Sequence, residues 1–271
     1  MIRSFCAFFA ILLLAAPTAA QEKPEPEVRS FNKKAVVNVD PKSGYIYFDN
    51  YFAGRVVLVR LPDDAARAER DAKRVEARAK FSDGKLVAAL RRIDYESRQK
   101  RTVVVDVRSF VPDARDEEGR KWFGILTKLP AGRYVIVGYD EFEYFWPSLC
   151  LCLGTVMFDA VPGKIVDLGQ MRSYRIEREG LGKKSASSIA GLTPGRGGLT
   201  SFYIAPRAKP PVLPRIGDTA VVPAQYYAVG RLSNATSSEI DRVTAIEGVI
   251  RYEPGKVIDA RTNQAAEPLD L

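Results

Sequence analysis

Two cysteines, Cys150 and Cys152, stand one residue apart in a chain of 271 residues that contains no histidine. In a regular β-strand their side chains would share a face, with Cα atoms about 6.6 Å apart, near the upper limit for a disulfide. Such a pair could form a strained and easily reduced disulfide. As two thiolates it could instead hold Cu(I), with a thioether from Met157 or Met171 as a third ligand. Met157 has the strand parity opposite to Cys152, so it would join the pair only if the chain bulged at Gly154.

The leucines around this pair favour a structural role. Leu149, Leu151 and Leu153 alternate with the cysteines, so both faces of the segment are apolar. Buried thiols that pack as small hydrophobic groups, or a local structural disulfide, then explain the pair without redox or metal chemistry. Tetrahedral zinc lacks two further ligands here. The sequence leaves a structural pair, a redox disulfide and a Cu(I) site open, and it predicts no bound cofactor.

The absence of histidine excludes the mechanisms that depend on it. Ser-His-Asp catalysis, Cys-His catalysis and histidine-ligated zinc all require a residue that this chain lacks. The sequence has no phosphate-binding loop of the Gly-x-x-x-x-Gly-Lys-Ser/Thr type, so we expect no nucleotide-dependent chemistry. We also expect no nucleic-acid partner. The acids Asp140, Glu141 and Glu143 could form a carboxylate pair, but this spacing is equally typical of an exposed strand. We therefore predict a protein that is not an enzyme.

Aromatic residues alternate in two segments that we expect to be strands. Tyr45 and Tyr47 share one face of the first segment, and Tyr144 and Trp146 share one face of the second. Exposed aromatic ladders stack on sugar rings, whereas buried ones form the core of a sheet protein. Burial is the commoner fate of aromatic residues on a sheet face, and carbohydrate binding is kept as a second alternative.

The first twenty residues have the pattern of a secretory signal peptide. Arg3 is followed by an apolar run over residues 5–16 and then by small residues up to Ala20. We expect cleavage after Ala20, a periplasmic or secreted protein of a Gram-negative bacterium, and no transmembrane segment after removal of the signal. The formal net charge of +8 is compatible with attraction to anionic lipid headgroups or wall polymers.

Short β-branched and aromatic runs between Gly and Pro turns predict a mainly β fold. We expect an antiparallel β-sandwich with an inserted helical hairpin and a β-rich C-terminal extension. The predicted parts are a signal peptide (1–20), a linker (21–34), a sandwich domain (35–177) with a helical insertion (63–98), a Gly/Ser/Pro-rich linker (178–214) and a small β-rich extension (215–271).

The predicted helical insertion begins where the sequence period changes. Apolar residues then recur three and four positions apart, at Ala65, Ala68, Ala72, Val75 and Ala79. Such a charged amphipathic hairpin is typical of a solvated excursion packed on one sheet, and a partner-binding arm is the functional alternative.

Two turn motifs carry a resemblance to a known group. The runs are Leu-Pro-Ala-Gly-Arg-Tyr-Val-Ile-Val at residues 129–137 and Val-Met-Phe-Asp-Ala-Val-Pro-Gly-Lys-Ile-Val-Asp-Leu-Gly at residues 156–169. They resemble the prealbumin-like β-sandwich modules of bacterial envelope proteins, and the mature chain is similar to uncharacterised secreted proteins of alphaproteobacteria. The resemblance spans about residues 44 to 170 and implies a fold but no activity. We expect a non-catalytic structural or binding module whose partner is an envelope protein or a wall polymer, with the thiol functions of Cys150 and Cys152 as the alternative.

Overall fold

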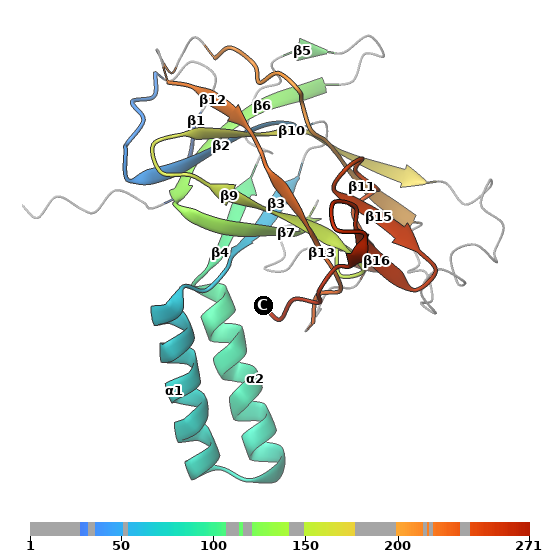
Figure 1. The fold of residues 1–271 in the computed structure, drawn as a ribbon. Coiled ribbons are helices and arrows are strands. Elements are labelled where there is room, and N and C mark those ends of the chain that lie inside the picture. The colour runs from blue at the N-terminus through green and yellow to red at the C-terminus, as the bar shows by residue number, and fades with distance from the viewer. Residues whose placement is uncertain are drawn as a thin grey trace, which may run out of the picture.

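A computed structural model describes residues 28–31, 36–50, 54–106, 114–115, 121–140, 149–176, 199–213, 216, 219–233 and 239–271. The predicted signal peptide therefore lies outside the described residues. Two seven-stranded sheets pack face to face, and two helices project from one end of the resulting sandwich (Figure 1). The described part of the chain is mainly β, and the predicted sandwich with a helical hairpin is confirmed.

The first sheet has the strand order β1-β6-β2-β10-β11, with β12 beside β10 and β5 beside β6. Its strands are β1 (Arg29–Phe31), β2 (Ser43–Asn50), β5 (Ala114–Arg115), β6 (Lys121–Pro130), β10 (Ile165–Ile176), β11 (Leu199–Ala205) and β12 (Val221–Pro223). Most pairs are antiparallel, but β10 runs parallel to both β2 and β12.

The second sheet has the order β13-β9-β7-β3-β4, with β8 between β7 and β14. Its strands are β3 (Arg55–Arg60), β4 (Thr102–Asp106), β7 (Gly132–Asp140), β8 (Leu149–Cys150), β9 (Thr155–Ala160), β13 (Tyr226–Val229) and β14 (Glu239–Ile240). A third, three-stranded sheet is formed by β15 (Ile250–Glu253), β16 (Lys256–Asp259) and β17 (Gln264–Ala265).

Alternation of side chains along the strands builds three apolar layers. In β2, Ile46 and Phe48 face the interior between the sheets, while Tyr45 and Tyr47 belong to a separate cluster on the outer face. In β3, Val57 and Val59 lie on the outer face of the second sheet. Both sheets are thus apolar on both faces, so each outer face has to be covered by other parts of the chain.

Chain segments outside the main strands supply that cover. The outer face of the first sheet packs against Val37 and Ile216. The outer face of the second sheet packs against Leu232 and the C-terminal residues Leu269 and Leu271. The last residues of the chain are therefore part of the fold.

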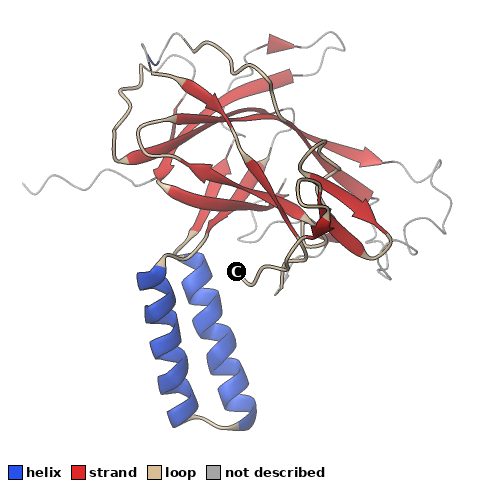
Figure 2. Ribbon diagram, viewed as in Figure 1, coloured by secondary structure: helices blue, strands red, loops and turns tan. Residues whose placement is uncertain are grey.

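The two helices form a hairpin between the neighbouring strands β3 and β4 (Figure 2). Helix α1 (Asp64–Lys80) begins after Asp63, whose carboxylate accepts a hydrogen bond from the backbone N–H of Ala66 at 2.8 Å. Helix α2 (Asp83–Gln99) follows after two residues and leads directly into β4. The helical arm, residues 63–100, projects away from both sheets (Figure 1), so the expectation that it packs on one sheet is wrong.

The structure also refines three predicted boundaries. Strand β1 lies within the predicted linker 21–34 and pairs with β6. Strand β11 lies within the predicted linker 178–214, because Phe202 and Ile204 alternate into the core. In the C-terminal extension, β12 and β13 add to the two sheets of the sandwich, whereas β15, β16 and β17 form a sheet of their own.

Candidate functional site

The two cysteines form a disulfide, and their Cα atoms are 5.1 Å apart. The expected strand spacing of about 6.6 Å is wrong because β8 ends at Cys150 and the chain turns through residues 151–154. Gly154, with a φ of +148°, completes this turn. The observed Cα separation lies within the ordinary range for disulfides, so the chain path does not impose the strain that a regular strand would.

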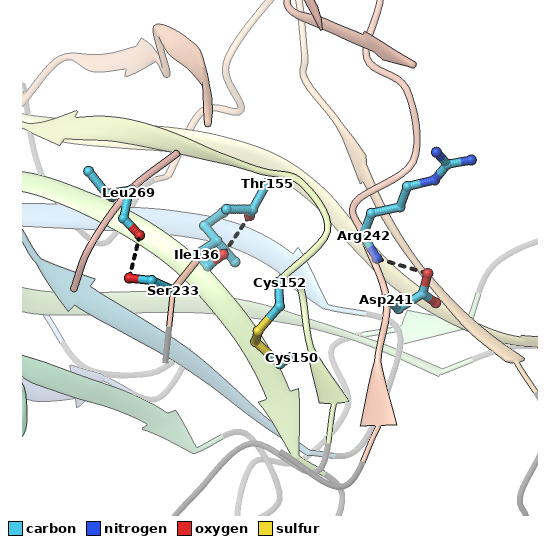
Figure 3. The surroundings of a disulfide bond; sticks show 8 residues. All are labelled: Ile136, Cys150, Cys152, Thr155, Ser233, Asp241, Arg242 and Leu269. Carbon is cyan, nitrogen blue, oxygen red and sulfur yellow. Dashed lines mark hydrogen bonds between the residues drawn. A yellow bond between two sulfur atoms is a disulfide. The ribbon is translucent and has the colours of Figure 1, made fainter. Parts of the chain in front are cut away.

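The disulfide is buried, as the flanking leucines predict. Figure 3 shows the disulfide and its surroundings. Cys150 is 6% exposed and Cys152 is 4% exposed, and both belong to the cluster that includes Leu271 and against which Leu269 packs. Backbone hydrogen bonds hold the loop on both sides: the N–H of Asp241 donates to the carbonyl of Cys150 at 2.8 Å, and the N–H of Leu232 donates to that of Cys152 at 3.0 Å. A reductant would reach the sulfur atoms only after this cover had moved.

The structure separates the two methionines considered as metal ligands. Met157 packs against the cluster that contains the disulfide, whereas Met171 lies in the interior between the sheets. Sulfur atoms joined in a disulfide offer no thiolate to Cu(I), so the metal alternative concerns only a reduced form of Cys150 and Cys152. Among the described residues, no group of three or more cysteine or acidic side chains is placed to hold a metal ion.

The proposed sugar-stacking residues of the first segment are covered. Tyr45 is 1% exposed and Tyr47 is 5% exposed, because Val37 and Ile216 pack over this face of the sheet. The hypothesis that these two tyrosines stack on a sugar is therefore wrong. Tyr144 and Trp146 lie outside the described residues, as do the acids Glu141 and Glu143.

A buried charge cluster lies on the same outer face and was not anticipated from the sequence. The guanidinium of Arg207 donates to Asp167 at 2.9 Å and also to Asp49. The side chain of Asp167 is fully buried, and Asp49 additionally accepts a hydrogen bond from the hydroxyl of Tyr47 at 2.8 Å. No described residue donates a hydrogen bond to the second carboxylate oxygen of Asp167. One arginine is thus shared by carboxylates from two neighbouring strands in a largely buried place, so the cluster keeps one uncompensated negative charge when both acids are ionised.

The electrostatic consequences appear at Asp49 and Tyr226. Burial raises the pKa of Asp49, and the negative charge of Asp167 adds to this, while Arg207 and the hydroxyl of Tyr47 oppose it. Burial also raises the pKa of Tyr226 well above its ordinary value, so its hydroxyl stays protonated and donates to the carbonyl of Leu168 at 2.7 Å. The cluster fastens the segment after β11 to β2 and β10.

The helical arm presents a different kind of candidate site. Helix α1 turns Ala66, Arg70, Arg74 and Ala77 toward α2, and of these only Ala77 is buried. At 100° per residue, the apolar stripe predicted from the sequence lies on the opposite face of α1. Every member of that stripe is exposed: Ala65, Ala68, Ala72, Val75 and Ala79.

Helix α2 differs, because its larger apolar residues face α1. Leu86, Leu90 and Ile93 are half-buried toward α1, whereas Val87, Arg91 and Tyr95 form an exposed row at four-residue intervals. Val75 is 63% exposed and Val87 is 49% exposed. The arm therefore leaves Val75 and Val87 in solvent, in addition to the alanines of the α1 stripe.

Ion pairs join the two helices in addition to the half-buried apolar residues of α2. Arg74 bonds Asp94 at 3.0 Å, and Lys100 bonds Glu69 at 2.9 Å. Hydrogen bonds from Lys73 and from Lys100 lower the pKa of Glu69 to about 2. The arm carries eleven Lys or Arg residues against eight Asp or Glu residues, so it keeps a net positive charge.

Comparisons with protein-family models, with curated proteins and with solved structures found no match. In the part of the chain that the structure describes, no helix is both long enough and apolar enough to cross a membrane.

Proposed function

We propose that this chain is a non-catalytic binding module of the Gram-negative envelope, and that its helical arm contacts another envelope protein. The observation that carries the proposal is the exposed stripe of α1, which lies on the face turned away from α2. A helix of a globular protein normally buries its apolar stripe. Here the arm projects from the sandwich, and nothing in the described part of the chain covers the stripe (Figure 1).

The charge of the arm indicates what kind of partner it binds. A second copy would bring two positively charged arms together, whereas a protein with an acidic rim around an apolar patch would complement both features. A lipid surface fits less well. The α1 stripe consists mainly of alanine, which is a small residue. The aromatic residue Tyr95 is not at the tip of the arm, because it lies twelve residues into α2, about 18 Å along the helix from its start. Membrane-bound helices instead concentrate large apolar residues on the buried face.

Site-specific photo-crosslinking in the native envelope tests this contact. A photoreactive residue in place of Val75 should capture one protein partner. The same residue in place of Arg92, whose side chain is 80% exposed on another face of α2, should capture it much less. Equal capture from both positions, or capture of lipid instead of protein, would contradict the proposal.

Deletion of the arm separates binding from folding. Strands β3 and β4 are antiparallel neighbours, and the N–H of Arg60 donates to the carbonyl of Arg101 at 2.9 Å, so a short turn can replace residues 63–100. The shortened chain should keep the thermal stability of the sandwich and lose the partner captured at Val75. Loss of folding would mark the arm as a structural element instead.

A further inference from the structure

We propose that a small surface cavity beside β15 and β16 binds a phosphoryl group. The cavity has a volume of about 30 Å³, which is room for roughly two water-sized groups. Its lining includes the cationic side chains of Arg231, Arg242 and Lys256, together with the ring of Tyr252. This site is separate from the helical arm, and the proposal does not rest on the function proposed for the arm.

The cations of this cavity have no acidic partner among the described residues. Twelve salt bridges are resolved in that part of the chain, and none of them involves Arg231, Arg242 or Lys256. The acid in the lining, Glu253, is bound by Arg251. The cavity therefore keeps a positive charge that an anion can neutralise.

Stacking orients one of these cations. The guanidinium of Arg242 lies 4.0 Å from the centre of the Tyr252 ring. The pKa of Tyr252 is raised by burial, so its hydroxyl stays protonated and donates to the carbonyl of Val243 at 2.7 Å. A guanidinium stacked by its flat face keeps the N–H groups of its edge free to bind oxygen atoms. Figure 3 shows the Arg242 side chain extending away from the disulfide.

The disulfide loop fixes the backbone on which two of the cations stand. The N–H of Leu153 donates to the carbonyl of Asp241 and the N–H of Val243 donates to that of Gly154, both at 2.9 Å, so Arg242 lies between two anchored residues. The N–H of Leu232 donates to the carbonyl of Cys152, which anchors the residue after Arg231. The site is thus built on a rigid backbone before any ligand binds.

The arrangement favours a phosphoryl group over a carboxylate. Arg231, Arg242 and Lys256 come from three separate segments and line the same cavity. A carboxylate has two oxygen atoms in one plane, which a single arginine can satisfy. A phosphoryl group offers three oxygen atoms in a tetrahedral arrangement, so it can accept a charge-assisted hydrogen bond from each cation.

Calorimetric titration of the full chain with inorganic phosphate at low ionic strength tests the site. We expect saturable binding at one site, weakened about tenfold in Arg242→Gln and in Arg231→Gln, because each loses one charge-assisted hydrogen bond. Arg231 is exposed, so its substitution leaves the fold intact even if Arg242→Gln does not. Acetate should bind far more weakly than phosphate.

Arg261→Gln provides a matched control. Arg261 also stacks on a tyrosine, at 4.6 Å from the ring of Tyr227, but it is paired with Asp259. Its loss should leave phosphate affinity unchanged. Absence of saturable binding, equal binding of acetate, or an equal effect of Arg261→Gln would overturn the proposal.

Two further titrations identify the source of the phosphoryl group. Glycerol phosphate represents a soluble phosphomonoester, and vesicles of uncharged lipid with a small fraction of phosphatidic acid present the same group on a lipid. Tighter binding to the vesicles at equal phosphoryl concentration, abolished in Arg231→Gln, assigns a lipid headgroup. Equal binding to both supports a soluble or polymer-borne phosphomonoester, because the membrane then adds nothing.

Discussion

Arg207 illustrates how one side chain can hold distant strands together at the residue scale. It bonds Asp49 in β2 and Asp167 in β10, and its guanidinium also lies 5.8 Å from the ring centre of Tyr47. Removal of Arg207 would leave two buried carboxylates uncompensated, which is costly because a buried charge without a partner has lost its hydration. The cluster is therefore one of the places where a single substitution should have a large effect.

The raised pKa of Asp49 predicts a pH dependence of stability. The folded-state pKa lies above the ordinary value of 3.8, so the contribution of this carboxyl is fully present below that value and is lost as pH rises through the folded-state pKa. Asp49→Asn removes this titration. The free energy of unfolding of the wild-type chain, minus that of the variant, should therefore fall as pH rises.

Urea unfolding of both proteins at steps between about pH 3 and about pH 7 measures this difference. A difference that stays constant or increases with pH would show that burial does not control the titration of Asp49. The variant keeps one acceptor oxygen and so loses one of the two hydrogen bonds from Tyr47 and Arg207, but that loss shifts the whole curve and leaves its direction with pH unchanged.

The residue scale also shows what the sequence can predict about sites. Burial of Cys150 and Cys152 follows from the adjacent leucines, since this is local information. Their Cα separation does not, because it depends on where β8 ends. The contact between Arg207 and Asp49 spans 158 positions, and no local spacing could indicate it. The cavity beside Tyr252 could not be predicted from the sequence either, because its cations come from separate segments.

At the scale of elements, Gly169 determines the course of β10. The pairing register of β10 with β2 shifts between Asp167 and Gln170, and Gly169 has a φ of +81° within this irregularity. A Cβ atom at Gly169 would meet the carbonyl oxygen of Ala205, a backbone atom that cannot turn aside. The strand can therefore bend at this position only with glycine.

Substitution of alanine for two different glycines should change the stability in opposite directions. Gly169→Ala should destabilise the protein by at least about 2 kcal/mol, from the left-handed backbone and the close approach to Ala205. Gly84→Ala, in the first turn of α2 with no atom within 4 Å, should stabilise the arm by about 0.5 kcal/mol. Thermal melting followed by circular dichroism compares both with the wild type. A similar sign for the two changes would contradict the roles assigned to these glycines.

The arm shows why periodicity alone is insufficient for packing. The sequence pattern correctly places Ala68, Ala72 and Val75 on one face of a helix. The pattern does not say whether that face contacts another element. In the structure, the face of α1 that contacts α2 is a different one, which contains Arg70 and Arg74. The side chains of these arginines are only 20% and 25% exposed while their guanidinium groups bond acids, a combination that hydrophobicity patterns do not detect.

At the scale of the whole molecule, the mainly β sandwich follows from turn residues and alternation. What the sequence does not indicate is which segments cover the two outer faces. Runs such as Val56 to Val59 are apolar on both sides, which predicts double burial, but the covering segments are distant in sequence. The parallel pairing of β2 with β10 was likewise missed, since it joins residues 45 and 165.

Truncation of residues 269–271 tests the cover of the second sheet. Leu271 is buried, and the N–H of Leu269 donates to the carbonyl of Arg231 at 2.9 Å. Loss of both leucines from the cluster should lower the free energy of unfolding by roughly 2 to 4 kcal/mol. Reduction of the disulfide by a small thiol should become faster, because its cover is gone.

Urea unfolding and a timed assay of free thiols measure the two effects. Glu267→Gln, which alters an exposed residue of the same segment and keeps both leucines, serves as the control and should change neither. If the truncated chain kept its stability and a slowly reduced disulfide, the C-terminal residues would not be the cover that the structure indicates.

The position of the arm between β3 and β4 also has a consequence for how the chain folds. A long excursion normally delays the pairing of the strands that it separates, because closing a larger loop costs more chain entropy. The contacts of α1 with α2 are local, and helical hairpins form quickly compared with sheets. Once the arm has folded, its two ends lie together, as the hydrogen bond between Arg60 and Arg101 shows. The insertion then behaves kinetically like a tight turn, so it can bring β3 and β4 into register before the distant strands arrive.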